Sequence, residues 1–155
     1  MEGAFRVNGR QVRISFEPGA RLLEVLRDSG HTEVKNGCSE GACGACVVLL
    51  DGALVNSCQV LAASVLDREI TTARGLGESD RPHPIQEAFA EAGAVQCGFC
   101  TPGMVTAAWA LLKEIPRPDE EQIRKALDGN LCRCTGYVKI VRAVNLASER
   151  MADHG

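Results

Sequence analysis

The hydrophobic positions along the chain change their spacing about halfway. In the first half, apolar side chains alternate with polar ones over short runs, which is the period of half-buried strands. The predicted strands are residues 4–7, 11–16, 46–50, 53–55 and 69–72, and the predicted helices are residues 22–30 and 60–66. Asn8-Gly9 joins the first two strands and Asp51-Gly52 the next two, and both dipeptides favour tight hairpin turns. A small β-rich unit is therefore expected.

In the second half, apolar residues recur every three or four positions, as in amphipathic helices. The predicted helices are residues 84–92, 102–115, 119–127 and 138–151. Pro116 and Pro118 end the second of them, and Asp119 is a favourable N-cap for the third. Thr101 is expected to cap the second helix, with Pro102 at its first helical position. The apolar stripes are expected to form a core that includes Phe89, Met104, Trp109 and Leu112.

The segment between the two halves, residues 75–82, is polar and rich in residues that interrupt helices and strands. We expect one domain over residues 1–75 and a second over residues 82–155. Short strands with one or two crossing helices are typical of a β-grasp fold of the ferredoxin type. The predicted fold class is therefore α+β, with a β-grasp domain followed by an all-α four-helix bundle.

Length and charge exclude several classes of function. A chain of 155 residues has room for two small domains but not for a large substrate pocket plus a nucleotide-binding domain. The net charge of -3 is spread over both halves, so we expect no nucleic-acid partner. The longest apolar runs are six residues, whereas a membrane span needs about 20. The N-terminal residues lack the basic and apolar regions of a signal peptide, so a cytoplasmic location is expected.

Eight cysteines stand out against this background, because a reducing compartment disfavours disulfides. They form two sets of four, which we name the first and second quartets. The first quartet, spaced C-x4-C-x2-C-x11-C, consists of Cys38, Cys43, Cys46 and Cys58. The second quartet, spaced C-x2-C-x31-C-x-C, consists of Cys97, Cys100, Cys132 and Cys134. The first three spacings match the plant-type 2Fe-2S loop, and each quartet can supply four thiolates to one metal centre.

The residues around the thiols suit an anionic cluster. Gly37, Gly41 and Gly44 alternate with cysteines, and glycine permits positive φ and close approach of backbone N–H groups to sulfur. In the second quartet, a cysteine precedes threonine at the start of two predicted helices, at Thr101 and Thr135. The positive ends of two helix dipoles would favour an anionic cluster there. Each domain is therefore expected to bind one 2Fe-2S cluster.

Zinc is the alternative metal, because all-cysteine zinc sites also use C-x2-C pairs. Zinc sites usually combine two short cysteine pairs, whereas the first quartet places three cysteines in one loop. The C-x-C of Cys132 and Cys134 is also shorter than the usual zinc spacing. A zinc-stabilised interaction module therefore ranks below an iron–sulfur protein, and elemental analysis separates the two.

Three segments, residues 37–46, 95–104 and 129–137, resemble the iron–sulfur subunit of the molybdenum hydroxylases, the family of xanthine dehydrogenase, aldehyde oxidoreductase and carbon monoxide dehydrogenase. The resemblance extends over roughly residues 5–146. It implies that the first quartet binds the cluster nearer the flavin and the second quartet the cluster nearer molybdenum. It also implies that Gln96 and Cys134 contact the pterin of the molybdenum cofactor, and that Cys134 is an iron ligand as well.

The resemblance further implies an electron-transfer subunit that relays electrons between a large molybdopterin-binding subunit and a medium FAD-binding subunit. A heterotrimer or a dimer of heterotrimers is expected. The chain has no nucleotide-binding or catalytic motif, so catalysis is expected on the partners. Residues 92–97 resemble the xanthine and purine branch, and an aldehyde is another candidate substrate. The alternative function is a free-standing 2Fe-2S electron carrier, a ferredoxin.

Overall fold

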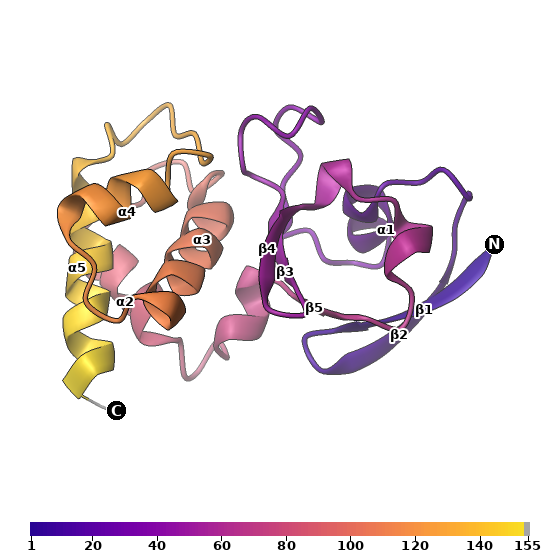
Figure 1. The fold of residues 1–155 in the computed structure, drawn as a ribbon, viewed down its shortest axis with the longest axis horizontal. Helices are drawn as coiled ribbons and strands as arrows, with labels where there is room; N and C mark the ends of the chain where they lie inside the picture. The colour runs from indigo at the N-terminus through magenta and orange to yellow at the C-terminus, as the bar shows by residue number, and fades with distance from the viewer. Residues whose placement is uncertain (154–155) are drawn as a thin grey trace.

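The structure is a computed structural model that describes residues 1–153, and it places a β-sheet beside a group of helices (Figure 1). The strands are β1 (Glu2–Val7), β2 (Arg10–Ser15), β3 (Val47–Leu50), β4 (Ala53–Asn56) and β5 (Glu69–Thr71). Their order in the sheet is β2-β1-β5-β3-β4. β1 pairs in parallel with β5, and the other neighbours are antiparallel. The predicted α+β class, with a β-grasp unit first and a helical unit second, is confirmed.

Both predicted hairpins are present, and their turns have the expected geometry. Asn8 and Gly9 have φ values of 51° and 75°, and Asp51 and Gly52 have values of 47° and 84°. Two successive residues in the left-handed region match the right-handed twist of the paired strands. The helix α1 (Leu22–Asp28) packs four buried apolar side chains into the core beside the sheet.

The helix predicted over residues 60–66 is present only as a short 3-10 helix, η2 (Ala62–Val65), and another, η1 (Ser57–Gln59), lies before it. Leu61 forms a bridge with Arg21, and the carbonyl of Val60 accepts the N–H of Leu22 at 2.8 Å. Because this carbonyl bonds to the start of α1, it does not accept the N–H four residues later, as it would in an α-helix.

The helical unit contains α2 (Pro84–Glu91), α3 (Thr101–Glu114), α4 (Glu120–Ala126) and α5 (Val138–Asp153), while the turn η3 (Ala73–Leu76) lies before it. Asp119 caps α4 as expected, because its carboxylate accepts the N–H of Gln122 at 2.8 Å. The predicted cap of α3 is wrong: Cys100 is the N-cap, and Thr101 is already helical. The N–H of Thr101 donates to the carbonyl of Gly98, which closes the first turn one residue earlier.

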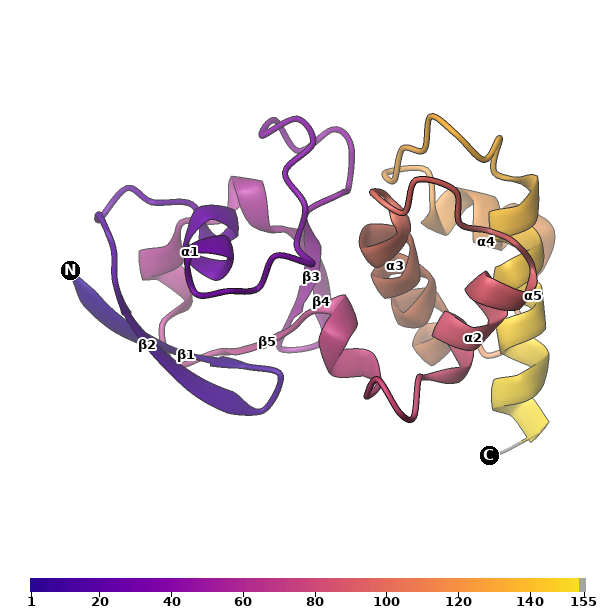
Figure 2. The ribbon, with the colours of Figure 1, turned by 180° about the vertical axis from the view of Figure 1, so that it is seen from behind.

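Each unit has its own apolar core. In the helical unit, Phe89, Met104 and Leu112 are buried as expected. Trp109 is only partly buried, and the ammonium of Lys113 lies 5.5 Å from its ring centre. The helix α3 lies between the sheet and the other long helices, and α5 lies on the far side (Figure 2). None of the helices in residues 1–153 is long and apolar enough to cross a membrane.

Candidate metal centres

Three cysteines of the first quartet, Cys38, Cys43 and Cys46, lie in a winding loop, residues 35–46, which we name the first loop. Within it, Ser39, Gly41 and Gly44 have φ values of 59°, 80° and 67°. Cys46 ends this loop directly before β3, and Cys58 lies in η1 directly after β4. Because β3 and β4 pair as a hairpin, the fourth cysteine is brought beside the third.

Gly37 serves the first loop differently from the way the sequence suggests. Its φ is not in the left-handed region, and it is Ser39 that takes such a conformation. A Cβ atom at Gly37 would lie 2.7 Å from the sulfur of Cys43. Glycine is therefore needed at this position for space around a thiol, and not for a turn.

Hydrogen bonds and burial make the thiols of the first quartet unequal. The N–H of Glu40 donates to the sulfur of Cys38 at 3.4 Å, and this bond is the main reason that the pKa of Cys38 falls to about 7. Burial raises the pKa of Cys46 to about 11. The side-chain amide of Gln59 donates to the sulfur of Cys58 at 3.4 Å. The partly exposed thiol of Cys38 therefore ionises more readily than the buried thiol of Cys46.

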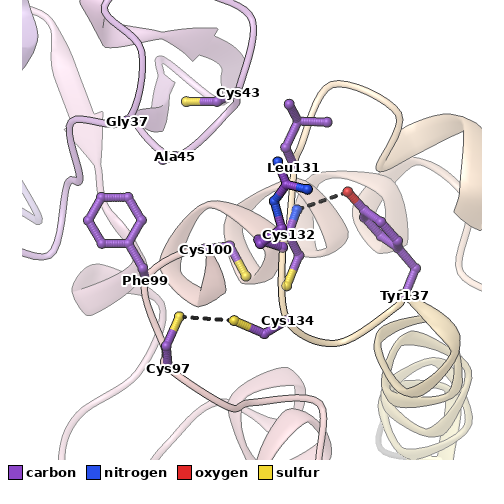
Figure 3. A pocket seen from close by; sticks show the side chains of 11 residues that line it. Gly37, Cys43, Ala45, Cys97, Phe99, Cys100, Leu131, Cys132, Cys134 and Tyr137 are labelled. Carbon is purple, nitrogen blue, oxygen red and sulfur yellow. Dashed lines mark hydrogen bonds between the residues drawn. The ribbon is translucent and has the colours of Figure 1, made fainter.

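The second quartet comes from two segments of the helical unit. Cys97 and Cys100 lie in the turn before α3, and Cys132 and Cys134 lie between α4 and α5. We name residues 128–137 the second loop. The four sulfur atoms point toward a common space (Figure 3). Here the thiol of Cys134 donates to the sulfur of Cys97 at 3.6 Å.

This space is part of a cavity of about 770 Å³ that both loops line. Its lining comprises Gly37, Cys43, Ala45, Cys97, Phe99, Cys100, Leu131, Cys132, Arg133, Cys134 and Tyr137. One cysteine of the first quartet, Cys43, thus reaches the cavity that holds the whole second quartet.

Thr135 and Tyr137 organise the second quartet around Cys132. The hydroxyl and the N–H of Thr135 donate to the sulfur of Cys132 at 3.1 and 3.4 Å. Burial raises the pKa of this thiol, but the bonds from Thr135 outweigh it and bring the pKa to about 7. The hydroxyl of Tyr137 accepts the N–H of Cys132 at 2.8 Å. Burial raises the pKa of Cys100 to about 12. Like the first quartet, the second therefore combines a thiol of lowered pKa, Cys132, with a thiol whose pKa is raised by burial.

The sulfur atoms meet in pairs. The contacting pairs are Cys38 with Cys43, Cys46 with Cys58, Cys97 with Cys134, and Cys100 with Cys132. Two thiolates on one tetrahedral metal lie about 3.8 Å apart, given metal–sulfur bonds of about 2.3 Å. Within residues 1–153, no three cysteine, histidine or carboxylate side chains gather tightly enough for a single metal ion. Paired thiols fit a two-iron cluster, with two ligands for each iron, better than a mononuclear zinc site.

Gln96 lies beside Cys134. Its side-chain amide donates to the carbonyl of Cys134 at 3.1 Å, and both residues are exposed. Exposed apolar side chains lie nearby. Val95 directly precedes Gln96, and Phe99 and Leu131 line the same cavity as Cys134.

Sequence reasoning missed the contact between the two loops. The N–H of Leu131 donates to the carbonyl of Cys43 at 2.9 Å. The side-chain amide of Asn130 donates to the carbonyl of Gly44 at 3.1 Å. Asn130 and Leu131 precede the second cysteine pair directly, but nothing in that position indicates a partner in the other unit.

Comparison with known proteins agrees with this arrangement. Residues 5–73 match the family of 2Fe-2S iron–sulfur cluster binding domains, and residues 72–145 match the family of 2Fe-2S binding domains. The chain is 51% identical to the nicotinate dehydrogenase small FeS subunit of Eubacterium barkeri over 148 residues, which are 95% of this chain and 94% of that protein. It is 46% identical to the xanthine dehydrogenase iron–sulfur-binding subunit of Escherichia coli O157:H7, over 89% of this chain and 88% of that one.

Among solved structures, quinoline 2-oxidoreductase from Pseudomonas putida 86 superposes with a TM-score of 0.94 and 37% identity. The match covers 99% of this chain and 96% of that one. A β-grasp unit and a helical unit, each with four cysteines gathered at loops, define a protein with two 2Fe-2S domains. The chain belongs to the small iron–sulfur subunits of the molybdenum hydroxylase family. In that family it is the electron-transfer subunit, and its relatives are named as small FeS or iron–sulfur-binding subunits of larger oxidoreductases.

Proposed function

We propose that each quartet holds one 2Fe-2S cluster and that the chain conducts electrons between molybdopterin on a large partner and FAD on a medium partner. When bound, such a cluster accepts and releases one electron at a time. The chain's own residues supply the thiolates, orient them in pairs, and donate hydrogen bonds to sulfur. The donors identified here are the N–H of Glu40, the amide of Gln59, and the N–H and hydroxyl of Thr135.

The observation that carries this proposal is the direct contact between the two quartets. The carbonyl oxygen of Cys43 accepts the N–H of Leu131, and Leu131 is joined by a peptide bond to Cys132. One hydrogen bond and a few covalent bonds therefore connect a ligand of the first quartet to a ligand of the second. A chain with two unrelated metal sites would not need this connection.

We infer the order of the sites from the resemblance to the molybdenum hydroxylases, together with their exposure. Cys97 and Cys134 are exposed, whereas Cys46 and Cys58 are buried. Gln96 donates to the carbonyl of Cys134, and the exposed side chains of Phe99 and Leu131 line the cavity beside the exposed pair. Exposed apolar side chains around a redox site suit a partner surface that excludes water from it. As the resemblance implies, the second quartet faces the molybdopterin-bearing partner, with Gln96 and Cys134 toward the pterin, and the first quartet faces the flavin-bearing partner.

The domain division belongs to the same proposal. We assign residues 1–75 to the first cluster domain and residues 82–155 to the second, although residues 154–155 lie outside the described part of the chain. Support comes from the two separate apolar cores. A reducing, cytoplasmic location fits eight cysteines with no disulfide among them.

Substrate choice rests with the partners in this proposal. Similar small subunits belong to enzymes named for nicotinate and xanthine, and the quinoline enzyme contains a chain of the same fold. The same relay design therefore accompanies chemically different substrates.

Purification of the tagged chain, produced together with the chains encoded beside it, tests the proposal. We expect co-purification with one molybdopterin-bearing and one FAD-bearing chain. A free-standing carrier would instead elute alone with its clusters. In the complex, reduction through the molybdenum site is expected to bleach the flavin in the wild type. In Cys100→Ser, molybdenum reduction is expected to persist while flavin reduction stops. Equal flavin reduction in both proteins would contradict the relay.

A further inference from the structure

A buried asparagine joins the two loops. Asn130 is only 4% exposed, although asparagine is usually found at the surface. Its backbone N–H donates to the carbonyl of Leu127 at 2.9 Å, which ties it to the end of α4. Its side-chain amide crosses to the other unit and donates to the carbonyl of Gly44 at 3.1 Å. The residue therefore has a fixed backbone and a side chain directed at the first loop.

The backbones around this bond are packed without room for another carbon atom. A Cβ atom at Gly44 would overlap the carbonyl oxygen of Gly129 and the side chain of Asn130. A Cβ atom at Gly103, in the first turn of α3, would overlap the carbonyl oxygen of Gly44. Gly44 and Gly103 thus let the first loop, the second loop and α3 meet at backbone distance.

The carbonyl of Gly44 accepts two hydrogen bonds with different roles. The N–H of Val47 donates to it at 3.3 Å from within the sheet unit, and this bond shapes the end of the first loop. The bond from Asn130 comes from the helical unit. Loss of the Asn130 amide therefore leaves the turn of the first loop its own bond and removes one of the links between the units.

This link lies next to ligands on both sides. Gly44 follows Cys43 directly, and Asn130 lies two residues before Cys132. We propose that Asn130 is a positioning residue that sets the separation and orientation of the two cluster sites. This inference rests on the proposed function. Without Asn130, the Leu131–Cys43 bond and the packing of α3 against the first loop still connect the units, but the side-chain link directly between the two ligand-bearing loops is lost.

Electron paramagnetic resonance of the dithionite-reduced, full-length protein tests the inference. Two reduced 2Fe-2S clusters are two unpaired spins, and their magnetic interaction splits each signal by an amount that depends on their separation and orientation. We expect Asn130→Ala to keep the iron and sulfide content of the wild type and to change this splitting. Asn145→Ala, the same chemical change on α5 outside both loops, is expected to keep the wild-type splitting.

Gly103→Ala provides a second variant that leaves every residue of both loops unchanged. Alanine favours a helix more than glycine does, so any effect on the splitting comes from the overlap with Gly44. Wild-type splitting in both Asn130→Ala and Gly103→Ala would overturn the positioning role while leaving the proposed function intact. A wild type without two cluster signals would overturn the proposed function itself, and the positioning role with it.

Discussion

The hydroxyl of Thr135 donates a hydrogen bond to the sulfur of Cys132 over 3.1 Å. Donors to sulfur stabilise the extra negative charge of a reduced cluster, so they raise its midpoint potential. A threonine also follows the cysteine at Thr101, but there the residue starts α3 and caps nothing. The two matching sequence positions therefore have different functions.

We predict that Thr135→Val lowers the midpoint potential of the second-quartet cluster by a few tens of millivolts. A hydrogen bond worth about 1 kcal/mol corresponds to about 40 mV for one electron. A potentiometric titration followed by electron paramagnetic resonance measures the shift. Thr101→Val is the matched control and is expected to leave the potential unchanged. Equal potentials in the wild type and Thr135→Val would contradict the assigned role of the hydroxyl.

Thiol reactivity is predicted to follow the hydrogen bonds and burial of the cysteines. Cys38 and Cys132 have pKa values of about 7, whereas those of Cys46 and Cys100 are about 11 and about 12. At pH 7, the thiolate fraction therefore differs by roughly a thousandfold or more, and the thiolate is the reactive form. In the cluster-free chain, iodoacetamide is expected to label Cys38 and Cys132 first, as read by peptide mass spectrometry.

The pH dependence of this labelling has a defined sign. Thiolate is lost as the pH falls through the pKa, so labelling of Cys38 and Cys132 is expected to slow about tenfold per pH unit below about pH 6. Labelling of Cys46 or Cys100 at the rate of Cys38 at pH 7 would show that burial does not control these thiols.

Because the two units have separate apolar cores, a core mutation in one unit is expected to affect mainly the cluster of that unit. Phe89 is buried in the helical core and Phe5 in the sheet core. Truncating a buried phenylalanine to alanine costs about 3–5 kcal/mol, so each variant is expected to weaken mainly its own unit. Phe89→Ala is predicted to lose the second-quartet cluster first, and Phe5→Ala the first-quartet cluster. Iron analysis with spin resonance distinguishes the two, and simultaneous loss of both clusters in each variant would contradict the domain division.

The partly buried carboxylate of Glu33 gives a further prediction. Burial raises the pKa of Glu33, but hydrogen bonds from the hydroxyl of Thr72 and from His31, together with the charge of Arg74, bring it below its usual value. A lowered pKa in the folded state means that the carboxylate stabilises the fold above its unfolded pKa. This stabilisation is lost as the pH falls through the folded value.

Glu33→Gln is therefore expected to reduce stability by about 1 kcal/mol, or roughly 2–4 °C in Tm for a chain of this length. The difference from the wild type is expected to stay constant from pH 8 to about pH 5.5 and to shrink below about pH 4.5. Thermal unfolding across this range measures it. Glu17→Gln, an exposed carboxylate, serves as the control. A difference that grows on acidification would reverse the assigned sign.

The hairpins could be predicted from the sequence because their determinants are local. Asn8-Gly9 and Asp51-Gly52 each take the left-handed conformations that a two-residue turn requires. The cysteines could likewise be grouped into two quartets from their spacing along the chain. The helix expected over residues 60–66 is shortened to a 3-10 helix because the carbonyl of Val60 bonds to the N–H of Leu22, which lies far from it along the chain.

The contact between the loops could not be predicted. Asn130 and Gly44 are 86 positions apart, and no sequence pattern at either residue indicates that the two are in contact. The role of Gly37 could not be predicted either. Its glycine was expected for backbone conformation, but it is needed because the sulfur of Cys43 occupies the space of a Cβ atom.

Quantitative analysis of metal, acid-labile sulfide and spin on the purified complex tests the central claim most directly. Two 2Fe-2S clusters require about four iron and about four sulfide per chain. Full reduction is then expected to give two distinct signals, each of about one spin per chain. Colourless protein that holds only zinc, or a single signal with about two iron per chain, would contradict the account.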